Sequence, residues 1–518
     1  MPDNGRLIRT AKRRRLAATL AAVAFSAGSS RTAAADTPSA ADLQTSLRAW
    51  LARVTNSEKA APPALTVTKD GQEFRIVVPV PGLAPTRADD QAGLTTRVHP
   101  LGGSRWAIDG VTLPSPSTIT IKPPPGGLKD AGPGLMRLRI GQQAATGVFD
   151  PSYATPSRLD ATFDDMHTEM ASKGLRQTQD YANYTMDMSL NPHPAPGAQG
   201  TRTLDAAETA VVRGVHLTSS GLATFDAQAD AFELTGKATD VDPDRVGDMF
   251  AATFRYAAAV ISSASSSAGP GHPLPIDRTT LRSVVAALTG LAGQVDIKES
   301  VRNLKVMTGG ATVSLGHAEV GMGGISRGGL LNAYLDFAVD RLYASNAPAS
   351  MRPYLPRHLH IHPTLSGVGT AEVIALMHAA LAPESQQDLM GAAVLGLFSH
   401  GGIKIGLDDL SIDLGDCDLT ASGSVNVPAP VPAVVSGKVE VIVHRLDALI
   451  SHLRSDPQAA QLVGALTMAK ALGRSDGGRM IWDIAYRGGT VLVNGHTVYP
   501  PESQDGSPSA DPGGAEHQ

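Results

Sequence analysis

Polar and apolar residues alternate along much of this 518-residue chain, and that period of two limits the fold more than any other feature. The pattern is plain in "SRLDATFDDM" (157–166) and in "YANYTMDMSL" (181–190). Successive side chains of a β-strand point to opposite faces, so each run predicts a strand with one apolar face. Helical spacing is confined to shorter stretches, such as residues 39–56 and about 242–261. We therefore predict a β-rich α+β fold with antiparallel sheets and a few packed helices.

Two Asp-Gly pairs predict hairpin turns between alternating runs. One lies in "LTVTKDGQEFRIVVPV" (65–80) at Asp70-Gly71, and the other in "RWAIDGVTLPSPSTITIK" (105–122) at Asp109-Gly110. Asp-Gly suits the two-residue turns that join antiparallel strands, because both central positions take positive φ.

An internal repeat divides the second half of the chain. Four landmarks recur in one order: a Leu-Thr-x-Ser-Gly run, a Gly-Lys pair, a helical stretch and a GG-x5-GH hairpin. The first copy has "LTSSG" (217–221), Gly236-Lys237, "DPDRVGDMFAATF" and "GGATVSLGH" (309–317). The second copy has "LTASG" (419–423), Gly437-Lys438, "HRLDALISHL" and "GGTVLVNGH" (488–496). Two such units, 217–320 and 419–498, each predict a sheet whose apolar face must be covered by the other, a helix or a ligand.

The N-terminus has the order of a secretory signal peptide. A basic region that ends in Lys12-Arg13-Arg14-Arg15 precedes an apolar run at 16–28 and the small residues Ala33-Ala34-Ala35. The apolar run of 13 residues is short of the ~20 that span a bilayer, so we predict cleavage near Ala35 and a periplasmic or secreted protein without a transmembrane segment in its mature chain. An uncleaved anchor is the alternative.

Charge and cysteine content narrow the partners. The chain has 44 Lys and Arg against 49 Asp and Glu, and residues 1–35 hold seven of the former and one of the latter, which leaves a mature net charge of −11. An acidic chain without basic blocks argues against nucleic acid, because phosphate contacts need clustered Lys and Arg. The single cysteine, Cys417, excludes an internal disulfide framework and a cysteine-based zinc cage, and is interpreted as a buried small residue.

The second repeat unit resembles a known family. The runs "DLTASGSVNVPAPVPAVVSGKVEVIVHRLDALISHL" (418–453) and "MIWDIAYRGGTVLVNGHTVYP" (480–500) look like the C-terminal part of AsmA-like bacterial envelope proteins, and more narrowly like a related periplasmic family of unknown function. "GSRWAIDGVTLPSP" (103–116) resembles an N-terminal strand pair of the narrower family. The resemblance implies a long, curved antiparallel sheet with an apolar concave face and a role in handling envelope lipids. It implies no catalytic residues.

The stretch "RHLHIHP" (357–363) is the first candidate for chemistry. His358, His360 and His362 fall at period two and therefore share one face of a strand. Two of them can share a zinc ion, but another element must supply a third ligand, and His378, nearby in sequence, has no assignable acidic partner. We favour an exposed strand face over a metal site.

Other motifs are weaker. "GISRG" (324–328) matches the G-x-S-x-G nucleophile elbow, with Ser326 followed by an expected helix at about 330–344 and with Asp413 or Asp416 and His496 as partners. An elbow needs regular β-α alternation, which this chain lacks. "DVDPD" (240–244) fails the EF-hand pattern, because Arg245 and Ala251 occupy its sixth and twelfth positions, and Asp242 is better interpreted as a helix N-cap.

The sequence thus predicts curved antiparallel sheets from two related repeat units with a few packed helices. We expect a non-catalytic envelope protein that binds lipid or another apolar ligand along a sheet groove, with no cofactor and no assigned catalytic or metal residue. The alternatives are a structural or interaction module that contacts envelope proteins, and a hydrolase or zinc enzyme on Ser326 or on His358 and His360. The predicted organisation is a signal peptide (1–35), an N-terminal helix (36–60), a β-rich region (61–200), a first repeat unit (201–350) with a linker (262–275), a second repeat unit (351–500) and a disordered tail (501–518).

Overall fold

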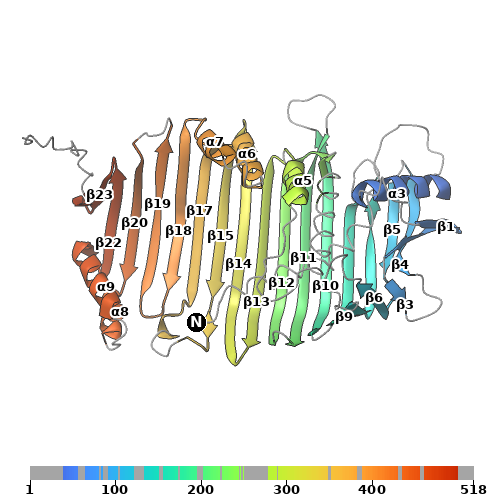
Figure 1. Cartoon of the computed structure of the whole chain (residues 1–518), viewed down its shortest axis with the longest axis horizontal. Helices are drawn as coiled ribbons and strands as arrows, with labels where there is room; N and C mark the ends of the chain where they lie inside the picture. Colours follow the sequence, from blue (N-terminus) through green and yellow to red (C-terminus); the bar gives the residue numbers. More distant parts are fainter. Residues whose placement is uncertain are drawn as a thin grey trace, which may run out of the picture.

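The chain folds into one curved, open antiparallel sheet, as the computed structural model shows (Figure 1). The predicted fold class is thereby confirmed, with the expected sheets merged into a single one. The structure describes residues 39–499 apart from 56–64, 81–82, 86–91, 103–104, 122–133, 151–155, 173–174, 195–201, 222–223, 244, 247–248, 250–251, 253–277, 289, 348–351, 382–387, 430–433 and 455–459. The predicted signal peptide, the linker at 262–275 and the tail lie outside the described residues.

Short strands form the N-terminal end of the sheet. They are β1 (Thr66–Asp70), β2 (Glu73–Pro79), β3 (Leu83–Pro85), β4 (Gly93–Gly102), β5 (Arg105–Thr112), β6 (Ser117–Ile121), β7 (Gly134–Arg139) and β8 (Gln142–Phe149). They pair in two branches, β1–β2–β4–β5–β8 and β3–β6–β7, and both branches join the same long strand, β9 (Pro156–Ser172).

From β9 onward the strands follow one another across the sheet nearly in chain order. They are β10 (Leu175–Pro194), β11 (Arg202–Gly221), β12 (Phe225–Val241), β13 (Gln294–Thr308), β14 (Ala311–Arg327), β15 (Leu330–Asp340), β17 (His358–Gly369), β18 (Gly402–Asp413), β19 (Asp418–Pro428), β20 (Ser436–His444), β22 (Arg479–Arg487), β23 (Thr490–Val493) and β24 (His496–Tyr499). The short β16 (Tyr343–Ala344) and β21 (Arg474–Asp476) add to β14 and β22.

Helices lie at the ends of strands and at both ends of the sheet (Figure 1). They are α3 (Ala40–Thr55), α5 (Arg278–Leu288), α6 (Thr370–Ala380), α7 (Asp388–Gly396), α8 (Leu446–Leu453) and α9 (Ala460–Leu472), with a 3-10 turn at Arg352–Tyr354. The expected helix at 39–56 is confirmed by α3. Of the expected helix at about 242–261, residues 243, 245, 246, 249 and 252 are helical, and the others lie outside the described residues or precede the helix.

The register of the strands carries one apolar row of side chains across the sheet. Each member faces the next on the neighbouring strand, so alternation along single strands adds up to a continuous surface. Apart from Glu299 on β13 its members are apolar, and the row consists of Ala145, Ala161, Met186, Ala210, Leu234, Glu299, Val320, Phe337, Ile361, Leu410, Ala421, Val441 and Trp482. We call the side of the sheet that contains this row the apolar face, and the opposite side the polar face.

A second row, of backbone irregularities, crosses the long strands. Asp165, Gly214, Asn303 and Arg341 all have positive φ, between 51° and 60°, and lie at one level on β9, on β11, on β13 and just after β15. On β11, the side chains that point to the apolar face lie at even positions up to Val212 and at odd positions from Val215 onward. The alternation shifts by one because Gly214, the row member on this strand, lies between them. The row members inside β9, β11 and β13 therefore keep apolar residues on the same face over the whole length of these three strands.

Both ends of the apolar face are covered. At the N-terminal end, Phe74 and Trp106 pack edge to face at 5.3 Å and join Phe163 and Met186 in one buried cluster. At the C-terminal end, α8 and α9 cover β20 and β22, with Val443, Leu446, Ile450, Met480 and the 3% exposed Cys417 in a second cluster. Burying one such side chain contributes about 1.5–3 kcal/mol. The prediction that Cys417 is a buried small residue is confirmed.

Two local predictions are wrong. Asp109-Gly110 is no hairpin turn, because β5 runs through both residues, and its partners are β4 and β8. His99 holds the Asp109 carboxylate at 2.6 Å across the ladder. The expected helix at about 330–344 is the strand β15, whose residues Leu335, Phe337 and Val339 follow period two on the apolar face. The hairpin at Asp70-Gly71 is confirmed.

The repeat landmarks lie in corresponding successions of elements. "LTSSG" ends β11 and "LTASG" lies in β19, and each strand is followed by a second strand, helical residues and a two-strand hairpin. The two hairpins turn at Gly309-Gly310 and at Gly488-Gly489, with nearly identical φ pairs of 55° and 83° and of 56° and 83°. The two predicted repeat units stay a prediction.

Candidate functional site

The central part of the apolar face is open. Met322 on β14 is 50% exposed and pairs with Leu335 on β15, which is 44% exposed, while Ile405 on β18 is 50% exposed. By contrast, Ala161 and Met186, on the same face near the N-terminal end, are 7% and 6% exposed. The register therefore builds a strip of mostly aliphatic side chains that is covered at its two ends and partly exposed over β14–β18, with side chains about half exposed on β14, β15 and β18.

Helices at one end of the central strands add further apolar surface. In Figure 1, α5, α6 and α7 lie along the upper edge of the sheet. Side chains of these three helices line a hollow of about 620 Å³. Its lining includes Ala375, Ala379, Leu389 and Ala392, with Arg282 and His378 among its polar groups. Leu395 on α7 is 65% exposed. A hollow of this size falls within the range of small-molecule pockets.

Two glutamates interrupt the apolar face, Glu299 in the row itself and Glu208 near the covered end. Glu208 on β11 points to the apolar face, and burial raises the pKa of its carboxyl group above the ordinary value. Burial, with Glu208 nearby, also raises the pKa of Tyr184 to about 12. Both shifts have the sign expected where a charged form is removed from water.

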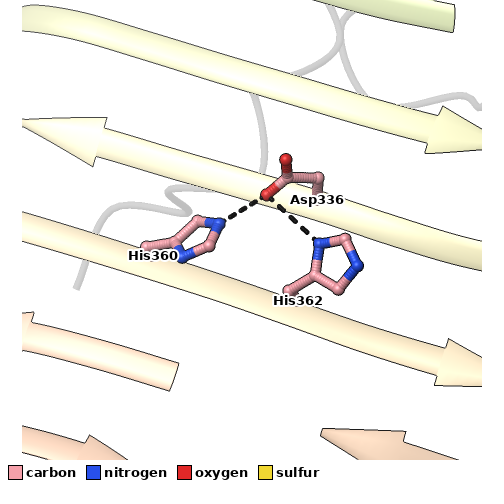
Figure 2. Close-up of side chains that lie close together, drawn as sticks. All are labelled: Asp336, His360 and His362. Carbon is pink, nitrogen blue, oxygen red and sulfur yellow. Dashed lines mark hydrogen bonds and ion pairs between the residues drawn. The ribbon is translucent and has the colours of Figure 1, made fainter. Parts of the chain in front are cut away.

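The polar face carries a cluster of histidines and carboxylates on β15 and β17, directly behind the open part of the apolar face (Figure 2). His360 Nε2 lies 2.6 Å and His362 Nδ1 3.8 Å from Asp336 Oδ1, which reaches them from the neighbouring strand β15. The three side chains are 26–28% exposed. His360 and His362 point to one side of β17 because they are two residues apart, as their spacing predicts.

Neighbouring strands hold the members of this cluster in place. The other ring nitrogen of His360, Nδ1, lies 2.6 Å from Asp409 Oδ2 on β18. Asp409, together with Asp336, raises the pKa of His360 above its ordinary value. Tyr334 stacks on the His362 ring at 5.3 Å, and its hydroxyl donates a hydrogen bond to Asp296 on β13. Burial and this hydrogen bond raise the pKa of Tyr334 to about 12.

The third histidine of "RHLHIHP" belongs to a different group. His358 Nδ1 lies 2.7 Å from Asp340 Oδ1, and His317 lies 3.5 Å from the other oxygen of the same carboxylate. The expectation that residues 357–363 form a strand is confirmed by β17. His378 lies on α6 and is not a member of either group.

The residues of the hydrolase hypothesis are not brought together. Ser326 lies on β14, and its hydroxyl pairs with Thr370 Oγ1 at 2.9 Å. Asp413 is on β18, and its carboxylate accepts a hydrogen bond from the Gly415 amide. His496 is on β24, at the far end of the sheet. The helix that an elbow needs is absent from the described residues after Ser326, where β15 follows instead.

Sequence reasoning missed Asp336 and Asp409. Asp336 was hidden because residues 330–344 were interpreted as a helix, although Asp336 and Asp340 alternate there with Leu335, Phe337 and Val339. Asp409 belongs to an alternating run, and only the register of β18 against β17 places it beside His360.

Comparisons with family models, with curated proteins and with solved structures gave no match. The resemblance to AsmA-like envelope proteins therefore stays a prediction. Among the described residues, no helix combines the length and apolar character needed to cross a membrane.

Proposed function

We propose that the protein is a non-catalytic, exported envelope protein that binds the acyl chain of a lipid along the apolar face of its sheet. The observation that supports this is the open aliphatic strip over β14–β18, where Met322 and Leu335 are about half exposed. Monomeric proteins rarely expose contiguous apolar surface without a use for it.

An acyl chain suits this strip better than a peptide does. The strip lies in the middle of the sheet, where neighbouring strands already pair on both sides, so it offers no free strand edge. A peptide bound there would lose hydrogen bonds between its backbone and water and gain none. An acyl chain has no such groups to satisfy. The row crosses thirteen strands, which at about 4.8 Å per strand is a path of roughly 58 Å, and its central part is open.

The expected export supports a lipid of the cell envelope. The signal peptide predicted at 1–35 sends the chain to the compartment that contains these lipids, and the mature net charge of −11 argues against binding through anionic head groups. Recognition would then depend on apolar contact. Export is tested by sequencing the N-terminus of the protein recovered from the periplasm or medium, which we expect to begin at Asp36.

A fluorescence assay tests the proposal. The purified protein is mixed with a phospholipid whose acyl chain carries an environment-sensitive dye, and emission is followed as unlabelled phospholipid competes. We expect a blue shift that saturates and is reversed by competitor. A protein whose apolar face serves only to contact another protein would leave the dye emission unchanged.

A further inference from the structure

The cluster on the polar face has the composition of a transition-metal site. Imidazole nitrogen and carboxylate oxygen are ordinary zinc ligands, and His360, His362 and Asp336 offer three atoms within 4.8 Å of one another. The two histidines come from one strand and the carboxylate from the next (Figure 2). This supplies the third ligand, from another element, that the sequence alone could not identify.

The distances fit an ion between the three side chains. With bonds of about 2.0–2.1 Å, two ligands of a tetrahedral zinc ion lie about 3.3 Å apart. The observed separations from Asp336 Oδ1, 2.6 Å to His360 Nε2 and 3.8 Å to His362 Nδ1, bracket that value. Side chains that are 26–28% exposed leave a path for the ion and a fourth position for water.

The surroundings match those of metal-binding histidines. Such a histidine usually donates its second ring N–H to a carboxylate, which fixes the tautomer and the ring orientation. His360 has this partner, because its Nδ1 lies 2.6 Å from Asp409 Oδ2. Tyr334 stacks on His362 with an interplanar angle of 16° and limits the rotation of that ring. Two of the three ligands are therefore oriented before an ion arrives.

We propose that Asp336, His360 and His362 bind one divalent transition-metal ion of the zinc type, with Asp409 as a positioning residue for His360. This inference does not depend on lipid binding. The ion would link β15 to β17 directly behind Leu335 and Phe337, in the part of the sheet whose apolar face is open. Metal binding would therefore stabilise the central strands.

Zinc titration of the full chain, produced without a histidine tag and stripped with a chelator, tests the proposal. By isothermal calorimetry we expect one equivalent of Zn²⁺ to bind the wild type. His360→Ala, His362→Ala and Asp336→Ala should each lower the affinity at least 100-fold, and Asp409→Asn about 10- to 100-fold. His358→Ala is the matched control, because this histidine lies on the same strand but pairs with Asp340, and it should bind zinc like the wild type.

Two further measurements protect the test against misfolding. Circular dichroism checks that each variant keeps its sheet. The wild type and His358→Ala should gain thermal stability when Zn²⁺ is added and lose that gain on chelation, whereas His360→Ala, His362→Ala and Asp336→Ala should gain none at the same Zn²⁺ concentration. Wild type that binds no zinc would overturn the proposal. So would zinc binding that persists in folded His360→Ala and His362→Ala, or that is lost equally in His358→Ala.

Discussion

Met322 on β14 and Leu335 on β15 are direct partners in the ladder, and each leaves about half of its side chain exposed on the apolar face. Two large aliphatic side chains in register are a favourable cross-strand pair. Their exposure means that about half of the stabilisation available from burying them is not realised within the chain. This pair defines the surface where we expect an acyl chain to lie.

Charged substitutions at this pair should weaken lipid binding. Full burial of a Leu or Met side chain contributes about 1.5–3 kcal/mol, so removing a half-exposed contact should cost about 1 kcal/mol, or roughly fivefold in affinity. We expect Met322→Glu and Leu335→Glu each to have at least this effect in the dye assay, since each also introduces a charge.

Leu101→Glu is the matched control for these variants. Leu101 is 45% exposed, but it lies at the end of β4, far along the sheet from β14 and β15. Its substitution changes net charge and exposed apolar area in the same way and should leave the affinity unchanged. An equal loss in all three variants would show that the apolar face has no special role.

Glu208 gives a pH-dependent prediction. Burial raises the pKa of its carboxyl group in the folded protein. The free energy of unfolding that depends on protonated Glu208 is therefore fully present below the pKa of the unfolded chain. It is lost as the pH rises through the folded-state pKa, because the buried carboxyl group must then ionise. Glu208→Gln should therefore raise the midpoint of urea unfolding at pH 7.5 and have little effect near pH 4.

The exposed Glu73 provides the comparison, because Glu73→Gln removes the same charge from a solvated position at the start of β2. We expect no change in the urea midpoint at either pH for that variant. A Glu208→Gln protein that is less stable than wild type at pH 7.5 would contradict the account of this residue.

Gly214 tests the row of positive-φ residues that crosses the long strands. Its φ is +60°, and an added Cβ would lie 2.7 Å from the Ala182 Cβ on β10. Gly71 has φ +62° with nothing within 4 Å of the same position. Gly71→Ala should cost about 1–2 kcal/mol for left-handed backbone alone, and Gly214→Ala about 1–3 kcal/mol more for the contact. Equal urea midpoints for the two variants would contradict this prediction, because they would show that β10 moves away from the added methyl group without a measurable loss of stability.

Ser326→Ala separates a structural hydroxyl from a catalytic one. Its hydrogen bond to Thr370 contributes about 0.5–1.5 kcal/mol, so a small loss of stability is expected. Lipid binding in the dye assay should match the wild type. Complete loss of the protein's role in a folded Ser326→Ala variant, with Thr370→Val unaffected, would revive the hydrolase hypothesis.

Alternation along single strands made most of the sheet predictable. The runs at 157–166 and 181–190 became β9 and β10, and helical spacing at 39–56 became α3. A short apolar stretch can fit both the helical and the strand period, and periodicity alone then does not distinguish a helix from a strand. For this reason "LLNAYLDFAVD" was predicted to be a helix, although it forms the strand β15. At Asp109-Gly110, strand pairing with β4 and β8 overrode the turn preference of the two residues.

The metal-site candidate was hidden for a different reason. His360 and His362 were visible in the sequence, but Asp336 and Asp409 lie 24 and 49 residues from His360 in the chain, and only the register of three strands brings them together. Register depends on the whole set of cross-strand contacts and not on local spacing. The sequence also could not show which part of the apolar face is open, because that depends on which elements pack against the face in the folded protein.

The central claim is tested most directly by native mass spectrometry of the chain purified from a host that contains membranes, followed by organic extraction of whatever is bound. We predict a mass above that of the protein by one lipid, near one-to-one stoichiometry, and recovery of that lipid in the extract. Loss of the bound lipid in Leu335→Glu, with retention in Leu101→Glu, would place it on the apolar face. A clean mass without bound lipid, from wild-type protein that also fails to take up the labelled phospholipid, would contradict the account.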